Sequence, residues 1–243
     1  MSKVKETLIA VNARREHLRM WHHLSWYGAT YIGLLVVALV MRLWGLDTQA
    51  VHHDESLHAV YSWYLYDGSG YVHDPMMHGP FQYISTAGIY SLFFDSNMTT
   101  RLLPALFGTL LVAVPYLLRT QLGRYGTLAT SMLITFSPTL LYYSRFARND
   151  IYMAVWTLAL IAFIWRYLTT RQVRYLLLSA VVLSLAFATK ETTYLTVAIL
   201  SFFLVFYAIG DVVPWLCGKK ELRRFSPAGD VLVLLVTLTL PIS

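Results

Sequence analysis

The sequence has little charge and almost no cysteine. Only 13% of its 243 residues are charged, whereas 57% are hydrophobic. A soluble domain of this length carries more charge and fewer apolar runs, so the composition indicates a polytopic membrane protein. The one cysteine, Cys217, excludes a disulfide framework and a cysteine-based zinc site within the chain. The net charge of +6 indicates membrane topology and no nucleic-acid partner, because basic residues gather in the cytoplasmic loops of membrane proteins.

Apolar segments long enough to cross a bilayer recur along the chain. The predicted spans cover residues 26–44, 101–118, 125–143, 151–168, 175–189, 192–209 and 231 onward. Residues 81–94 are apolar but short, about 21 Å of helix against a hydrocarbon core of about 30 Å. Another short helix, rich in aromatic residues, is predicted from Asp54 as its N-cap to about Tyr66. The expected fold is all-α, with at least seven spans and two interfacial helices in the first outer loop.

The basic residues predict the orientation of these spans. Residues 1–24 form a basic segment that is expected to be cytoplasmic, and residues 25–243 form the transmembrane domain. If residues 81–94 do not cross, the basic loops at 119–124, 171–174 and 219–224 also lie inside, as the positive-inside rule requires. The basic residues that then lie on the outer face of the plasma membrane are Arg42, Arg101, Arg145, Arg148 and Lys190.

The same topology places Asp54, Asp150 and Glu191 together on the outer face. The chain then stops inside an apolar stretch, from Val231 to Ser243. We therefore expect it to be a truncated membrane domain, without a C-terminal part and an outer soluble domain. Membrane lipids and other membrane subunits are the expected surroundings.

Ionisable side chains are most closely spaced in residues 52–58, His-His-Asp-Glu-Ser-Leu-His. Asp54 and Asp150 on one face can share a divalent cation such as Mg, Mn or Zn, with Glu55 or His58 nearby. The guanidinium groups of the outer arginines suit phosphate. A metal, a carboxylate base and arginines at a membrane surface predict one reaction class. A hydroxyl or amine attacks a group carried on a lipid-linked phosphate, the carboxylate takes the proton, and the metal and arginines stabilise the departing phosphate.

Four motifs in order make this prediction specific. Asp54-Glu55 follows the first span, and His78-Gly79-Pro80 precedes a short apolar helix. Arg-Leu-Leu-Pro-Ala-Leu-Phe-Gly then starts at residue 101, and Tyr-Ser-Arg-Phe-Ala-Arg-Asn-Asp ends at residue 150. Over about residues 25–210, the set resembles the GT-C superfamily of glycosyltransferases. Within it, the chain is most similar to the branch of dolichyl-phosphate-mannose-protein mannosyltransferase-like and flippase-activity-associated glycosylation-cluster proteins.

The resemblance implies an inverting hexosyltransferase that uses a polyprenyl-phosphate-linked sugar. Asp54, Glu55 and Asp150 are the expected catalytic acids, with Asp54 as general base, and Asp54, Asp150 and His58 are the expected metal ligands. Relatives often carry Lys-Pro-Pro where this chain has His78-Gly79-Pro80, so His78 is expected to replace the lysine in part. The expected substrate-binding residues are Arg101, Arg145, Arg148, His78, Lys190 and Glu191.

A different class of function is left open by the residues. The chain can be a non-catalytic helical subunit, with a glycosyltransferase fold retained as the scaffold of a larger membrane complex. Each site residue also has an ordinary structural explanation: Asp54 and Asp150 can cap helices, Lys190 and Glu191 can pair locally, and arginines can reach the interface from within a span. A metal or a lipid phosphate between Asp54 and Asp150 would favour the enzyme, whereas an empty, closed cavity and an extensive interface with other chains would favour the scaffold.

Overall fold

The structure is a computed structural model that describes residues 26–70, 78–216 and 226–240. The predicted cytoplasmic segment, residues 1–24, lies outside these ranges. The described residues form helices and no strand. After a first helix at Trp26–Leu43, the helices are α2 (His53–Tyr66), α3 (Phe81–Phe93), α4 (Asn97–Ala113), the 3₁₀ turn η2 (Val114–Leu118), α5 (Arg119–Phe136), α6 (Pro138–Ser144), α7 (Asp150–Thr170), α8 (Val173–Phe187), α9 (Thr193–Leu216) and α10 (Pro227–Thr239).

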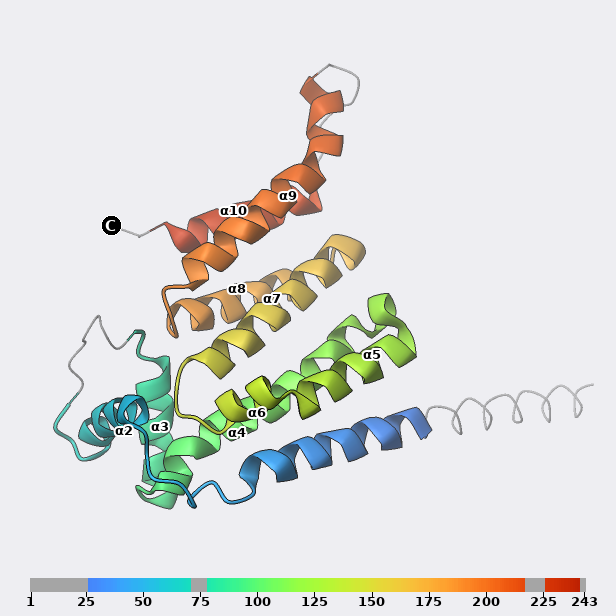
Figure 1. Cartoon of the computed structure of the whole chain (residues 1–243). Helices are drawn as coiled ribbons and strands as arrows, with labels where there is room; N and C mark the ends of the chain where they lie inside the picture. The colour runs from blue at the N-terminus through green and yellow to red at the C-terminus, as the bar shows by residue number, and fades with distance from the viewer. Residues whose placement is uncertain (1–25, 71–77, 217–225, 241–243) are drawn as a thin grey trace, which may run out of the picture.

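The long helices form a stack of neighbouring pairs (Figure 1). The first helix lies at one side, followed by α4 with α5 and α6, then α7 with α8, and then α9 with α10. The core runs along α7, where Ile151, Val155, Ala159 and Ile164 are buried at helical spacing. Large apolar side chains on α9, such as Phe202, stay exposed on the outside of the stack. An apolar exterior of this kind suits lipid rather than water.

The prediction of an all-α polytopic membrane fold is confirmed. The first helix, the α4–α5 segment and α7 are each long and apolar enough to cross a bilayer, and α8, the apolar part of α9 and α10 are shorter apolar helices. The predicted span over residues 125–143 is wrong as one helix, because it breaks at Ser137-Pro138 into α5 and α6. The Ser137 side chain accepts from the Leu140 N–H, so it caps α6 while the proline occupies the first helical position.

Helices α2 and α3 pack against each other at one end of the stack, across the ends of the longer helices (Figure 1). This is the arrangement predicted for two short helices that do not cross the bilayer. It gathers the end of the first helix and the starts of α4, α7 and α9 beside them. The loops expected to share the outer face therefore meet at this end.

The predicted N-cap of α2 is wrong by two residues. The cap is His52, whose Nδ1 accepts from the Asp54 backbone N–H at 3.3 Å. Glu55 completes a capping box by accepting from the His52 backbone N–H at 3.0 Å. Because Asp54 is thereby released from capping, its carboxylate is available to other groups.

Candidate functional site

The adjacent acids Asp54 and Glu55 have different surroundings. Glu55 is fully buried, and its carboxylate pairs with Arg101 at 2.6 Å between Oε2 and Nη2 and 2.8 Å between Oε1 and Nε. The Ala147 backbone N–H donates to the same carboxylate at 2.9 Å. Burial raises the pKa of the Glu55 carboxyl, but these hydrogen bonds and the charge of Arg101 outweigh burial and hold it below its usual range. Glu55 thus ties α2 to α4 and to the loop before α7.

Arg101 has no donor left for a phosphate among its described contacts. Its Nε and one Nη2 hydrogen go to Glu55, and the remaining N–H groups go to the carbonyls of Leu46, Gln49 and Ala50. A guanidinium has five N–H donors, so all are used. This geometry leaves Arg101 no free donor for the substrate that it was expected to bind. Glu55, one of the expected catalytic acids, instead holds segments of the protein together.

Asp54 instead begins a chain of ion pairs with partners that are distant in sequence. Its Oδ2 lies 3.1 Å from Arg148 Nη1, Arg148 Nε lies 3.8 Å from Asp150 Oδ2, and Asp150 Oδ1 lies 3.0 Å from Lys190 Nζ. The side chains of Asp54, Arg148 and Asp150 are 43%, 37% and 35% exposed. The first turn of α2, the start of α7 with the residues before it, and the α8–α9 loop therefore contribute alternating charges to one solvent-accessible group, which we call the Asp54–Lys190 chain. The expected meeting of Asp54 and Asp150 takes place through Arg148.

His78 and Glu191 form a separate pair close to Lys190. His78 Nδ1 lies 2.8 Å from Glu191 Oε2. Burial raises the pKa of the Glu191 carboxyl, but its own backbone N–H, His78 and Lys190 lower it overall. Gly79 lets this segment approach the α8–α9 loop closely, because an added Cβ at that position would lie 2.2 Å from the Ala188 carbonyl oxygen. The Gly79 and Phe81 N–H groups donate to the Thr189 and Ala188 carbonyls, which fixes this segment against the α8–α9 loop.

His58 is buried one helical turn after Asp54. Burial lowers the pKa of its imidazole to about 4, and nearby His78 and Arg148 lower it further while Asp54 and Asp150 oppose the shift. Its Nδ1 has no hydrogen-bond partner among the described residues. A neutral ring at this position adds no charge to the Asp54–Lys190 chain.

The predicted metal site does not fit the described residues. No group of three or more His, Cys, Asp or Glu side chains converges there in a way that could hold a metal ion. The charges beside Asp54 and Asp150 are those of Arg148 and Lys190, which pair with three of their four carboxylate oxygens in place of a divalent cation. We therefore assign no step to a metal, and the expected ligand set of Asp54, Asp150 and His58 is not assembled.

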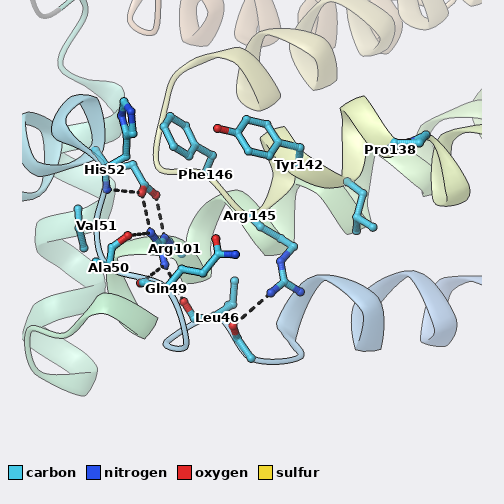
Figure 2. A pocket seen from close by; sticks show the side chains of 13 residues that line it. Leu46, Gln49, Ala50, Val51, His52, Arg101, Pro138, Tyr142, Arg145 and Phe146 are labelled. Atoms are coloured by element: carbon cyan, nitrogen blue, oxygen red, sulfur yellow. Dashed lines mark hydrogen bonds and ion pairs between the residues drawn. The ribbon is translucent and has the colours of Figure 1, made fainter.

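Arg145 lies apart from this chain, although it is only three residues from Arg148. Its Nη1 donates to the Met41 carbonyl at 2.9 Å and its Nη2 to the Gly45 carbonyl at 3.1 Å. It lines a cavity of about 640 Å³ whose other walls include Tyr142 and Phe146. Figure 2 shows this cavity between the end of the first helix and α6. Arg145 and Arg148, both expected to bind substrate, therefore lie in different surroundings.

Two buried polar residues beneath the site were not predicted. Asn149 precedes α7 and is 2% exposed, yet its amide has no hydrogen-bond partner among the described residues. Gln82 on α3 donates to the Ala147 carbonyl at 2.8 Å, which holds the loop that carries Arg148. Asn149 could have been noticed from its place directly before Asp150, whereas nothing in the sequence around Gln82 marks it.

The helical architecture and the charged cluster at one end define the class: a polytopic membrane protein with the GT-C fold. The family model for dolichyl-phosphate-mannose-protein mannosyltransferases matches residues 77–228. The chain belongs to this family, as the order of its motifs predicted. No curated protein sequence matches the chain.

A solved structure shares the fold. The chain is similar to ArnT from Cupriavidus metallidurans, in a crystal structure with undecaprenyl phosphate bound, with a TM-score of 0.59 and 19% sequence identity. The match covers 89% of this chain and 40% of that protein, so the chain spans well under half of that relative's length.

Proposed function

We propose that this chain is part of a membrane glycosyltransferase that moves a sugar from a polyprenyl-phosphate donor to an acceptor on the outer face of the plasma membrane. The observation that carries the proposal is the Asp54–Lys190 chain: two carboxylates and two cations from separate loops, accessible at the end of the helices. Membership in the mannosyltransferase family supports glycosyl transfer. The undecaprenyl phosphate bound to ArnT supports a polyprenyl phosphate as the lipid partner.

In this reaction Asp54 is the general base. The acceptor oxygen attacks the anomeric carbon of the sugar, and the bond from that carbon to the phosphate oxygen breaks. The electron pair leaves with the polyprenyl phosphate, and the acceptor proton passes to the Asp54 carboxylate. Attack opposite the leaving group inverts the anomeric centre. Asp54 suits this role because its side chain is partly exposed and holds only one described partner, Arg148.

Arg148 and Lys190 stabilise the charge on the departing phosphate. Arg148 uses Nη1 on Asp54 and directs Nε toward Asp150, so its Nη2 donors remain for a phosphate oxygen. Asp150 holds Lys190 and Arg148 on opposite carboxylate oxygens, which places the two cations side by side. Positive groups fixed before the reaction stabilise developing negative charge without reorganisation. Asp150 therefore orients cations in this mechanism.

The test is a matched pair of carboxylate-to-amide changes. Asp54→Asn should lower transfer from a polyprenyl-phosphate sugar by about 10²- to 10⁴-fold, the usual contribution of a general base. Asp95→Asn makes the same chemical change at an exposed acid between α3 and α4, outside the chain of ion pairs, and should transfer sugar at the original rate. Both variants should unfold at the same temperature as the original protein in detergent.

Undiminished turnover in folded Asp54→Asn protein would refute the assignment of the base. Absence of turnover in the unmodified protein with every polyprenyl-phosphate sugar tried would favour the scaffold alternative, in which the charged chain fixes loops and catalyses nothing.

A further inference from the structure

The cavity beside Arg145 is distinct from the proposed catalytic group. It is lined by the loop after the first helix, by the start of α2, by Arg101 and by α6 with the residues that follow it. Neither Asp54 nor Arg148, Asp150 or Lys190 is among its lining residues. The loop between α6 and α7 separates the two: Arg145 and Phe146 face the cavity, whereas Arg148 pairs with Asp54 on the other side.

The cavity has a net positive charge. Arg101 and Glu55 neutralise each other at its inner end. Arg145 has no carboxylate within 4.0 Å among the described residues, and its two hydrogen bonds to carbonyls leave three N–H donors unused. Arg42, the penultimate residue of the first helix, donates to Ser144, next to Arg145, but it is fully buried and does not line the cavity. The charge of Arg145, which has no described anion beside it, favours an anionic ligand here.

The walls of the cavity indicate the kind of anion. The Tyr142 and Phe146 rings stack with centroids 5.4 Å apart, and the His52 ring lies 5.6 Å from Phe146. Leu46, Pro138 and Leu141 continue the apolar wall. Figure 2 shows the aromatic rings above the Arg145 side chain, with the first helix below it. A charged group at one side of the cavity suits a lipid headgroup, and the apolar walls beside it suit the start of the lipid chains.

The position of the cavity along the first helix agrees with binding of a lipid headgroup. It lies at the end of the first helix, beside Trp44, whose side chain is 78% exposed. Exposed Trp and Tyr side chains at helix ends mark the membrane–water interface, where lipid phosphates are found. A volume of about 640 Å³ lies within the usual range for small-molecule sites, about 300–1,000 Å³.

We propose that this cavity binds the phosphate of an anionic membrane lipid, with Arg145 donating to the phosphate oxygens and the Tyr142–Phe146 wall contacting the start of the lipid chains. The site is separate from the catalytic group and does not depend on glycosyl transfer. A lipid bound there bridges α6 and the loop that follows the first helix, both of which line the cavity.

The experiment measures binding of phosphatidylglycerol to the detergent-purified protein by native mass spectrometry, and the accompanying rise in unfolding temperature. Arg145→Gln should weaken binding by about tenfold or more, since a hydrogen bond to a charged group contributes about 1.5–3 kcal/mol. Ala50→Trp, which fills the cavity and keeps Arg145, should weaken it similarly. Arg148→Gln removes the same charge three residues away and should bind phosphatidylglycerol as the original protein does.

Two further probes test the chemistry of the ligand. Diacylglycerol lacks the phosphate and inorganic phosphate lacks the chains, so both should bind much more weakly than phosphatidylglycerol. Equal binding of diacylglycerol would overturn the role of Arg145, and equal binding of inorganic phosphate would overturn the lipid. Equal losses in Arg145→Gln and Arg148→Gln would overturn the separation of the two sites. Asp54→Asn should lower transfer by about 10²- to 10⁴-fold and keep lipid binding, so failure of one proposal is distinguishable from failure of the other.

Discussion

Two arginine–carboxylate assemblies at the same end of the molecule differ in almost every physical respect. The Glu55–Arg101 pair is sealed, with side-chain exposures of 0% and 6%, and every N–H donor of the arginine is used. The Asp54–Arg148 pair is about two-fifths exposed, and part of its arginine is free. The two acids are neighbours in sequence. The comparison shows that one step along a helix separates a buried, fully paired carboxylate from one that stays accessible to solvent.

Breaking the sealed pair should have the largest effect on stability. Arg101→Ala leaves the Glu55 charge buried without its partner, which costs about 3–5 kcal/mol in the free energy of unfolding. Denaturant unfolding in detergent measures this loss. The double variant Glu55→Gln with Arg101→Met should recover part of it, because no isolated charge remains. A loss below about 1 kcal/mol in Arg101→Ala would show that water reaches Glu55 and that the pair is not sealed.

As the pH falls, the buried His58 should be protonated before the buried carboxylate of Glu55. His58 has a folded-state pKa of about 4, below the ordinary value near 6.5, so the unfolded chain binds the proton more readily. Stability is then complete above about pH 6.5 and falls as the pH drops to about 4, by roughly 3 kcal/mol in total. The stabilising effect of Glu55, whose folded-state pKa is lowered, is lost only at lower pH. Unfolding followed against pH measures both steps.

His58→Gln should remove the first of these steps and leave the second. A fall in stability between pH 6.5 and 4 that is unchanged in this variant would assign the effect to another group.

Breaking the accessible pair should have the smallest effect on stability. Arg148→Ala removes an ion pair that water already screens, and such pairs contribute about 0–1 kcal/mol. The unfolding free energy should therefore change by less than about 1 kcal/mol, while transfer activity falls through loss of the phosphate contact. Unfolding and turnover measured on one preparation give both values. A loss as large as that of Arg101→Ala would mean that the two assemblies are equivalent and both structural.

Much of the fold could be predicted because hydrophobic length is a local property. Most of the helices, the two short helices packed together at one end and the shared end of Asp54, Asp150 and Lys190 all follow from run lengths and loop charges. Pro138 also indicated a helix break, because proline is poorly tolerated inside a helix. The apolar residues on both sides of it nevertheless predicted one continuous span.

The partners of each charge could not be predicted because they depend on packing between distant segments. Glu55 and Arg101 are 46 positions apart, and nothing local indicates that one arginine of the outer face is sealed while another is free. The same holds for Arg145 and Arg148, which the loop turns to opposite sides. The described residues do not assemble the expected metal ligands for this reason: residue types suited to a cation were identified, but the arginine and lysine that pair with them were not.

The Glu55 pair also sets an order of events during synthesis. Glu55 leaves the ribosome before either Arg101 or Ala147, the two groups outside its own helix cap that hold its carboxylate. Until α4 has been inserted, α2 carries an acid with no cationic partner and stays in contact with water. Docking of the first two short helices therefore waits for the second long segment, and the neighbouring Asp54 acquires its ion-pair partner only when Arg148 emerges still later.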